Sequence, residues 1–277
     1  MDGTLILCGT PIGNLGDASP RLGEALAAAD VVFAEDTRRA RVLLDHLGVK
    51  ARTESYFAGN EEQRAGMLAE LLSGGATVAL ITDAGMPAVS DPGLSAVRVA
   101  RGVGATVSVV PGPSAALAAL AVSGLASDRF VFEGFLPRKG GERSERLAEL
   151  TFEDRTIVLF SATSRVLADL EALSEALGHD RSVTVGRELT KAHEEVWSGA
   201  LGDAVAEWAE RTPRGEFTLV VSGREARPMG LQAAIDDVLA RLDRGEVMSD
   251  AVKLVAETVG VRRRSLYEAV LEQRTAD

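Results

Sequence analysis

The sequence predicts an α/β protein of two domains that is followed by a small helical extension. Three observations lead to this prediction. Short apolar runs alternate with helical stretches in the first half, two runs in the second half are close enough to form a hairpin, and the composition changes after Gly223 and Arg224. With 277 residues, of which 46% are hydrophobic and 26% are charged, the chain is long and apolar enough for a sizeable core.

Four short apolar runs in the first half are predicted to be buried parallel strands, because turn residues bound each of them. They are residues 4–8, 31–35, 77–82 and 106–110. Ser19 and Pro20 are expected to begin the first helix as its N-cap and first helical residue. Asn60 and Gln63 resemble a capping box at the start of a later helix. Helices are expected to stop at three glycines, which are Gly48, Gly74 and Gly102.

The second half is predicted to contain a mixed sheet, because two of its strands are joined closely around Lys191 and Ala192. The expected strands are residues 130–135, 156–160, 182–188, 194–198 and 217–221. The expected helices are residues 142–150, 165–177 and 201–211. The boundary between the two α/β domains is predicted near residues 124–128, which gives domains at 1–124 and 125–226.

Residues 227–277 are predicted to form a helical extension. Residues 231–242 have an amphipathic pattern, and residues 251–259 and 265–271 are predicted to be two helices joined at Gly260 and Val261. The pair resembles a helix-turn-helix in which three arginines precede the second helix. A plain helical hairpin packed on the rest of the protein is the simpler interpretation, and the sequence alone favours it.

Composition excludes several kinds of site. A single cysteine, Cys8, rules out a disulfide framework, and three scattered histidines do not form a metal-binding pattern, so no metal is expected. The uncharged run 102–127 is long enough to span a bilayer, but Pro111 and Pro113 interrupt it and its residues are mostly small. With no secretory signal, we expect a cytoplasmic protein without membrane contact. P-loop, G-x-G-x-x-G, zincin and nucleophile-elbow motifs do not occur.

Three glycine- and proline-rich loops follow predicted parallel strands. They are residues 9–14, 83–93 and 111–115. Ligands bind at the carboxyl ends of strands in open α/β sheets, and glycine lets the backbone approach a ligand closely. We therefore expect a slot walled by main chain that suits a cofactor held by backbone amides. The alternative, that these loops only turn the chain, stays open at this stage.

An ordered series of motifs resembles the tetrapyrrole (corrin/porphyrin) methylase superfamily. The first half carries GTPIGNLGD (9–17), EDTR (35–38), TDAGMPAVSDPG (82–93) and PGPSA (111–115). The second half carries FEGFLPRK (132–139), RELTKAHEEVWSG (187–199) and GEFTLVVSG (215–223). More narrowly, the series is similar to the branch that 2′-O-methylates a cytidine of small-subunit (16S) ribosomal RNA. The resemblance implies the class III methyltransferase fold, in which two α/β domains hold a cofactor cleft between them.

The resemblance also implies S-adenosyl-L-methionine as the cofactor and assigns its contacts by position. These are Pro11, Gly13, Asp83, Ala84, Gly85, Val89, Ser90, Ser114, Ala115, Phe160, Gly186 and Arg187. One segment departs from the family pattern of aromatic, Glu, Ser, Pro, His and Arg. Residues 160–165 are FSATSR, which keep Phe160 and Arg165 but lack the acid and the histidine. Neither missing group can be essential here if the assignment holds.

Methyl transfer to a ribose hydroxyl needs positioning of the reactants and removal of the hydroxyl proton. Because a sulfonium is a good leaving group, a weak general base is enough. The candidate catalytic residues are Glu133, Glu188, Lys191 and His193. Lys191 or His193 could serve as the base or contact a phosphate, and Glu188 could orient either of them. The alternative is that the acids form surface ion pairs and that His193 caps a hairpin.

The formal net charge of −11 argues against non-specific coating of nucleic acid, so RNA binding would need local basic clusters. The candidate RNA contacts are Arg38, Arg39, Arg41, Arg138, Lys139, Arg262, Arg263 and Arg264. We expect weak affinity for random RNA and useful affinity only for the assembled 30S subunit. The resemblance further implies a homodimer. Two other functions stay open, namely methylation of a tetrapyrrole precursor and non-catalytic binding during ribosome assembly.

Overall fold

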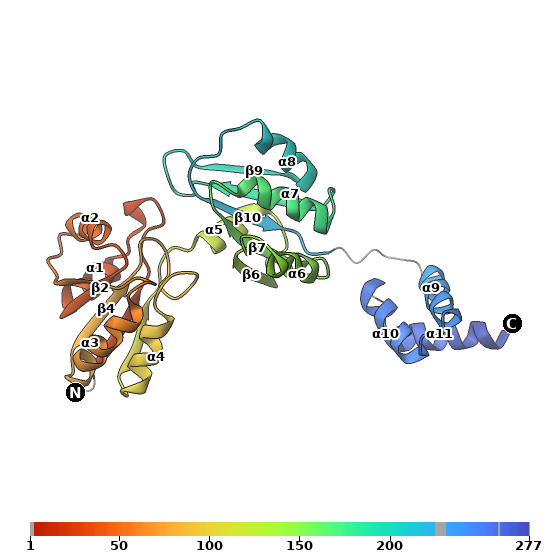
Figure 1. Cartoon of the computed structure of the whole chain (residues 1–277), viewed down its shortest axis with the longest axis horizontal. Helices are drawn as coiled ribbons and strands as arrows, with labels where there is room; N and C mark the ends of the chain where they lie inside the picture. The colour runs from red at the N-terminus through yellow and green to blue at the C-terminus, as the bar shows by residue number, and fades with distance from the viewer. Residues whose placement is uncertain (1–2, 225–230, 260, 277) are drawn as a thin grey trace. The chain divides into compact units, whose positions relative to one another are not determined.

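The computed structural model describes residues 3–224, 231–259 and 261–276. They belong to two compact units, Met1–Ser222 and Gly223–Asp277. In the described residues, the first unit contains two five-stranded sheets with helices packed on them, and the second unit is helical (Figure 1). The predicted α/β class is thus confirmed, and each unit is described by itself below.

The first sheet is parallel throughout and has the strand order β3-β2-β4-β1-β5. Its strands are β1 (Thr4–Cys8), β2 (Val31–Ala34), β3 (Thr53–Ser55), β4 (Thr77–Ile81) and β5 (Thr106–Val110). The four predicted strands are confirmed to within one residue. The short strand β3 was not predicted, because its sequence, Thr-Glu-Ser, contains no apolar run. All five strands end at the same edge of the sheet.

Helices cover both faces of this sheet (Figure 1). Helices α1 (Pro20–Ala28) and α2 (Thr37–Leu47) share one core with the sheet, through residues such as Leu26 and Leu43. Helices α3 (Glu61–Ser73) and α4 (Leu94–Gly102) form the core on the other face. Between β1 and α1 lies a single 3-10 turn, η1 (Leu15–Asp17). The loops at the carboxyl ends of β1, β4 and β5 stay free of these cores.

The predicted helix boundaries are confirmed in part. Ser19 caps α1, because its hydroxyl accepts a hydrogen bond from the Leu22 N–H at 3.2 Å. Gly48 ends α2 in the left-handed conformation with φ +67°, which glycine adopts without strain. The capping box at Asn60 is wrong, since its side chain makes no cap bond. It accepts instead from the Phe57 N–H at 2.8 Å and donates to the Ser55 carbonyl at 3.2 Å, which fixes the turn between β3 and α3.

The second sheet is mixed and has the strand order β6-β7-β10-β8-β9. Its strands are β6 (Phe130–Phe135), β7 (Thr156–Ser161), β8 (Ser182–Arg187), β9 (Glu195–Ala200) and β10 (Phe217–Val221). Strands β6 and β7 are parallel, whereas β8 pairs antiparallel with both β9 and β10. The predicted hairpin around Lys191 is therefore confirmed.

Helices pack on both faces of the second sheet as well. Helices α6 (Gly141–Leu150), α7 (Val166–Leu177) and α8 (Leu201–Ala209) enclose the larger core, which includes Trp208. Helix α5 (Ala115–Ser123) packs on the opposite face through Ala119 and Leu120. Because α5 follows β5 of the first sheet directly, the loop before it brings the edge of the first sheet to a face of the second.

The second unit is built from α9 (Leu231–Asp243), α10 (Met248–Val259) and α11 (Arg263–Ala276). A core that includes Ile235, Val252 and Leu266 joins them. The three predicted helices are confirmed, although α10 and α11 each begin earlier than expected. Gly260, half of the predicted turn, lies outside the described residues. Among the described helices, none combines the length and the hydropathy needed to cross a bilayer.

Candidate functional site

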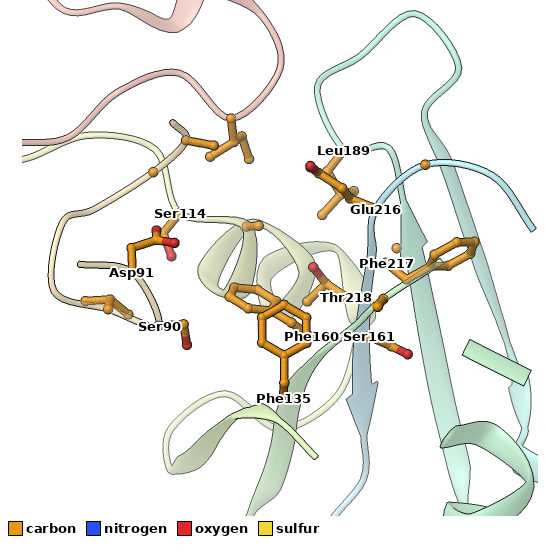
Figure 2. A pocket seen from close by; sticks show the side chains of 18 of the residues that line it. Ser90, Asp91, Ser114, Phe135, Phe160, Ser161, Leu189, Glu216, Phe217 and Thr218 are labelled. Atoms are coloured by element: carbon orange, nitrogen blue, oxygen red, sulfur yellow. The ribbon is translucent and has the colours of Figure 1, made fainter. Parts of the chain in front are cut away.

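A cavity of about 420 Å³ lies where the loops of the first sheet meet the second sheet (Figure 2). The first half of the chain lines it with Ile12, residues 84–86, residues 89–91, Ser114 and Ala115. The second half lines it with Phe135, residues 160–163, Gly186, Leu189 and residues 215–218. All three glycine- and proline-rich loops contribute residues, so they do more than turn the chain.

The loops of the first half are joined through their backbones. Thr10 N donates to the Gly85 carbonyl at 2.9 Å, and Gly85 N donates to the Thr10 carbonyl at 3.2 Å. A Cβ placed on Gly112 would lie 2.6 Å from the carbonyl carbon of Gly9, so only two glycines allow the first and third loops to touch. Positive φ angles at Ala88 (67°) and Ser90 (62°) show that the middle loop is held in a strained conformation.

The second half contributes aromatic rings and a buried acid behind them. Phe160 lies with its ring centroid 5.6 Å from that of Phe135, and both rings face the cavity (Figure 2). Ser161, the residue after Phe160, donates a hydrogen bond from its Oγ to Asp169 at 2.6 Å. Arg143 and Arg165 pair with the same carboxylate at 2.9 and 3.2 Å. Arg165, which the family pattern retains, thus supports the wall of the cavity from behind.

The charge in this cavity is one-sided. Within the described residues, no lysine, arginine or histidine lines it, whereas Asp91 and Glu216 do. Burial, followed by the nearby carboxylates of Glu35, Asp83 and Glu216, raises the pKa of Asp91 to about 6. The cavity therefore disfavours anions and favours ligands that are neutral or positively charged.

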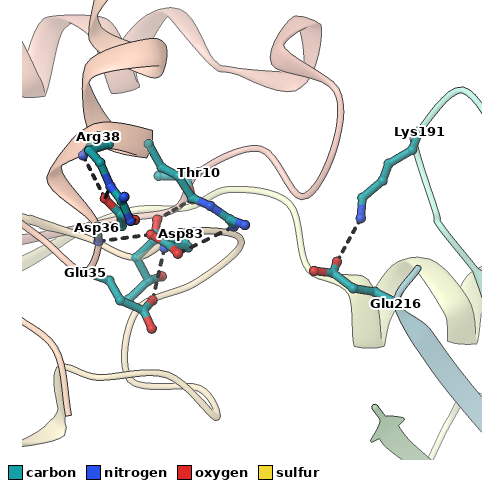
Figure 3. Close-up of polar contacts among 9 residues, drawn as sticks. Thr10, Glu35, Asp36, Arg38, Asp83, Lys191 and Glu216 are labelled. Carbon is teal, nitrogen blue, oxygen red and sulfur yellow. Dashed lines mark hydrogen bonds and ion pairs between the residues drawn. The ribbon is translucent and has the colours of Figure 1, made fainter. Parts of the chain in front are cut away.

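Two of the predicted catalytic residues, Glu188 and Lys191, lie together beside Glu216, and Figure 3 shows the contact between Lys191 and Glu216. Lys191 Nζ donates to Glu188 at 2.7 Å and to Glu216 at 3.0 Å. Burial lowers the pKa of Lys191, but these two hydrogen bonds outweigh that effect and the pKa is raised. A lysine that stays protonated can contact an anion but is a poor proton acceptor.

The other two predicted catalytic residues lie elsewhere. Glu133 is almost fully buried in an ion pair with Arg146 at 2.6 Å, and it lines a separate cavity with Pro137 and Glu149. His193 is exposed in the hairpin loop and does not line the main cavity. The geometry thus joins Glu188 and Lys191 to Glu216, which lines the main cavity, and places Glu133 and His193 away from that cavity.

Most of the predicted cofactor contacts line the main cavity. They are Ala84, Gly85, Val89, Ser90, Ser114, Ala115, Phe160 and Gly186. Pro11 and Asp83 line a neighbouring cavity instead, and Gly13 packs against Lys191. The Arg187 side chain is bound to the Arg214 carbonyl at 2.8 Å and to Glu195 at 3.2 Å. The sequence analysis missed Asp91, Phe135 and Glu216, although all three stand inside the quoted motifs.

The neighbouring cavity, of about 220 Å³, lies at the ends of β1, β2 and β4 beside α2. Its polar wall links the EDTR motif to the loop after β4 (Figure 3). Asp83 accepts from the Asp36 N–H at 3.0 Å, and Glu35 accepts from the Asp83 N–H at 3.2 Å. Arg39 pairs with Asp83 at 3.5 Å. In contrast to the main cavity, this one therefore offers a cation as well as carboxylates.

The predicted RNA-contact residues are exposed, but many of them have acidic partners. Arg38 pairs with Asp36 at 2.7 Å, a contact that lowers the pKa of Asp36 to about 2, and Arg41 pairs with Asp45 at 3.9 Å. In the second unit, Arg264 pairs with Glu268 at 2.8 Å. The remaining candidates of the same set are exposed too, namely Arg138, Lys139, Arg262 and Arg263.

The structure thus defines an α/β protein of two sheets that hold a ligand-sized cavity between the loops of one sheet and a face of the other. The sequence profile of the tetrapyrrole (corrin/porphyrin) methylases matches residues 4–205. The chain belongs to this family. A second profile, described as the RsmI C-terminal HTH domain, matches residues 230–274. That match supports the helix-turn-helix interpretation of the second unit over the plain hairpin that the sequence alone favoured.

Several relatives are similar over nearly the whole chain and carry the name "Ribosomal RNA small subunit methyltransferase I". The protein from Synechocystis sp. is 44% identical over 98% of this chain and 98% of its own length. The protein from Mycobacterium tuberculosis is 45% identical over 98% of this chain and 96% of its own. The protein from Escherichia coli O157:H7 is 40% identical over 98% of this chain and 96% of its own length.

Solved structures share the fold at lower identity. The uroporphyrin-III-C-methyltransferase from Thermus thermophilus matches 79% of this chain and 94% of its own, with a TM-score of 0.55 and 22% identity. A cobalt precorrin-4 methyltransferase matches 79% of this chain and 94% of its own, with a TM-score of 0.60 and 20% identity. At this identity the likeness concerns the fold alone.

Proposed function

We propose that this chain is an S-adenosylmethionine-dependent methyltransferase that acts on small-subunit ribosomal RNA. The acceptor in this proposal is the ribose 2′-hydroxyl of a cytidine in 16S RNA. Two findings support it. Relatives at 40–45% identity over nearly the full length carry the name of a small-subunit ribosomal RNA methyltransferase. The main cavity, in addition, has the chemistry that this cofactor needs.

The observation that carries the cofactor proposal is the charge of the main cavity. S-Adenosylmethionine carries a sulfonium, an ammonium and a carboxylate and is therefore a cation overall, and the charged residues that line the cavity, among those described, are Asp91 and Glu216. Among the described residues that line the cavity, a nucleotide cofactor with phosphates would find no cationic side chain, in contrast to the usual phosphate site. A volume of about 420 Å³ falls in the range of cavities that hold ligands of this size.

The lining residues suit the other parts of the cofactor as well. Phe160 and Phe135 offer aromatic faces for an adenine ring. Gly85 has φ +78°, a conformation that glycine adopts without strain, and its lack of a side chain lets the main chain come close to the ligand. Ser114 caps α5, so the positive end of that helix also faces this region. When bound, the cofactor would supply an electrophilic methyl group on a good leaving group.

The RNA side of the proposal depends on the first unit. Arg38, Arg39 and Arg41 stand on α2, and Arg39 lines the second cavity. Their acidic partners reduce the positive potential, and the whole chain carries −11. We therefore propose that affinity comes from the shape of the assembled 30S subunit rather than from charge alone. A cytoplasmic location would follow from such a substrate.

A homodimer is part of the same proposal. Three apolar side chains on β5 and α5 are about half exposed, namely Val109, Leu117 and Val122. Strand β5 is an edge strand of its sheet, and exposed apolar groups in such a place are typical of an interface. Sedimentation at micromolar concentration should give a dimer, which Leu117→Glu should convert to a monomer.

Two alternative functions have weaker support. A tetrapyrrole precursor as acceptor is suggested by the solved structures, but these are only 20–22% identical. A non-catalytic assembly factor would have no use for the main cavity and should not bind the cofactor. Neither alternative explains the near full-length similarity to relatives with a ribosomal RNA methyltransferase name.

The test is methyl transfer from labelled cofactor to three acceptors in parallel, which are unmodified 30S subunits, naked 16S RNA and a tetrapyrrole precursor. We expect label on the 30S subunits, and after nuclease digestion it should appear in 2′-O-methylcytidine. Label that appears only on the tetrapyrrole would overturn the proposed substrate, and label on a base rather than a ribose would overturn the proposed position.

A further inference from the structure

Asp91 is a cavity-lining carboxylate that the sequence motifs did not single out. It lies in the loop between β4 and α4, and its side chain extends toward the cavity (Figure 2). The loop is held firmly, because the Gly93 N–H donates to Glu61 at 2.9 Å and the Ala88 N–H donates to the Pro92 carbonyl at 3.0 Å. The backbone at Asp91 is therefore held in place before any ligand binds.

The carboxylate of Asp91 has three acidic neighbours from other parts of the first unit. Glu35 and Asp83 line the second cavity, and Glu216 lines the main cavity. Asp91 thus lies where the acids of the two cavities come together. If the main cavity holds the cofactor and the second receives part of the acceptor, this is the place where the two reactants would meet.

Among these four acids, Asp91 has the least engaged carboxylate. Glu35 accepts from the Asp83 N–H, Asp83 accepts from the Asp36 N–H and pairs with Arg39, and Glu216 pairs with Lys191. Within the described residues, no group donates a hydrogen bond to Asp91 or forms an ion pair with it. A carboxylate in this condition can still accept a proton from a ligand.

We propose that Asp91 is the catalytic residue that accepts the proton of the acceptor hydroxyl; this inference rests on the proposed methyltransferase function. The hydroxyl oxygen bonds to the methyl carbon while its proton passes to the Asp91 carboxylate. The C–S bond breaks, and its electron pair remains on sulfur, which becomes a neutral thioether. Asp91 then releases the proton to solvent, so charge and atoms balance.

The titration of Asp91 suits this role. Burial first, and then the carboxylates of Glu35, Asp83 and Glu216, raise its pKa to about 6. It is thus a stronger base than an ordinary carboxylate and is still ionised at pH 7. The earlier candidates suit it less well, because the pKa of Lys191 is raised and Glu188 already accepts from Lys191 and the Glu216 N–H.

The experiment compares wild type with Asp91→Asn by kcat against pH on unmodified 30S subunits, at saturating S-adenosylmethionine. We expect kcat to fall by about 10²- to 10⁴-fold. The dissociation constant for the cofactor, from calorimetry, should change by less than about threefold. The wild-type profile should have an acid limb near pH 6, and the residual activity of the variant should lack it. Glu35→Gln, which removes a neighbouring charge, should move the wild-type limb to lower pH.

The matched control is Glu62→Gln, an exposed acid on α3 that should leave the limb unchanged. A kcat for Asp91→Asn within threefold of wild type, with the same acid limb, would overturn the proposal. Cofactor affinity lost in proportion to activity would overturn it as well, because Asp91 would then serve only to bind the cofactor. Absence of methyl transfer to ribosomal RNA by the wild type is a different result, since it rejects the proposed function itself.

Discussion

The two halves of the first unit build the same cavity by different means. The first half contributes main chain, because its parallel strands end at one edge and their glycine-rich loops pack directly on each other. The second half contributes side chains that stand on the strands themselves, such as Phe160 on β7 and Thr218 on β10. The loops at the edge of the first sheet therefore face the side chains of the second sheet across the cavity.

Because of this difference, the two halves are sensitive to different kinds of substitution. Backbone contacts fail when a Cβ is added, since neither chain can withdraw without moving its strand. A side-chain wall fails when a ring or its supporting acid is removed, and the backbone then stays in place. Substitutions in the two halves should therefore differ in the kind of effect that they have.

Asp169→Ala should have the largest effect on stability. Asp169 is buried and pairs with two arginines, which would lose their ion-pair partner beneath the side-chain wall. Removal of one partner from a buried ion pair costs about 3–5 kcal/mol in the free energy of unfolding. Urea unfolding measures it. Glu171→Ala, an exposed acid on the same helix, should stay within about 0.5 kcal/mol of wild type; equal effects of both would contradict the proposed support.

Gly112→Ala tests the backbone wall. Its Cβ would lie 2.6 Å from the Gly9 carbonyl carbon, so the loop before α5 must shift. We expect a loss of about 1–3 kcal/mol in the free energy of unfolding and weaker binding of the cofactor. Gly66→Ala is the control, because Gly66 lies in α3 with no atom within 4 Å of an added Cβ. That control should be neutral or stabilising by up to about 1 kcal/mol.

Phe160→Ala tests the side-chain wall and should affect binding more than folding. Phe160 is only partly buried, so the fold should tolerate its removal, while the adenine ring loses its aromatic surface. Loss of this apolar contact should cost about 1.5–3 kcal/mol in binding free energy, which raises the dissociation constant of S-adenosylmethionine by roughly 10- to 100-fold. Phe57→Ala, a partly exposed ring outside the cavity, should leave that constant unchanged. Unchanged affinity of the Phe160 variant would remove the ring from the site.

Asp91→Asn should have a small stabilising effect that depends on pH. Folding raises the pKa of Asp91 from 3.8 to about 6, so between these values the folded chain holds a proton that the unfolded chain has released. The free energy of unfolding therefore falls as pH rises through this window, and the loss is complete above pH 6. The variant escapes this loss. At pH 7.5 the variant should melt at a higher temperature than wild type, by about 2–4 °C for each kcal/mol gained in the free energy of unfolding. At pH 4 the difference between the two melting temperatures should be smaller.

Sequence patterns located the elements better than the contacts between them. The runs at β1, β6 and β10 were predicted to the residue, because apolar strands bounded by turn residues leave a clear pattern. The strand β3 left none, and Asn60 used its side chain for a turn rather than for a cap. Propensity cannot distinguish those two uses of an asparagine, since both satisfy a local N–H.

The sequence predicted which loops form the candidate site, but it did not predict the charged residues that line it. Glycines and small residues such as Gly85 and Ala115 were placed in the cavity because their loops follow parallel strands. Asp91 and Glu216 were missed, although their motifs were recognised. For Asp91 the reason is that nothing in the sequence shows which acids lack a cationic partner. That property depends on the fold, which pairs Glu133 with Arg146 and Asp36 with Arg38 but leaves Asp91 without a cation among the described residues.

We propose that the two unlike walls form one cavity for a cationic cofactor, and titration calorimetry measures that binding. Wild-type protein should bind one S-adenosylmethionine per chain, while ATP, which shares the adenosine but carries phosphates, should give no detectable heat under the same conditions. Gly112→Ala and Phe160→Ala should each weaken the binding. Absence of S-adenosylmethionine binding, or equal binding of ATP, would contradict the account.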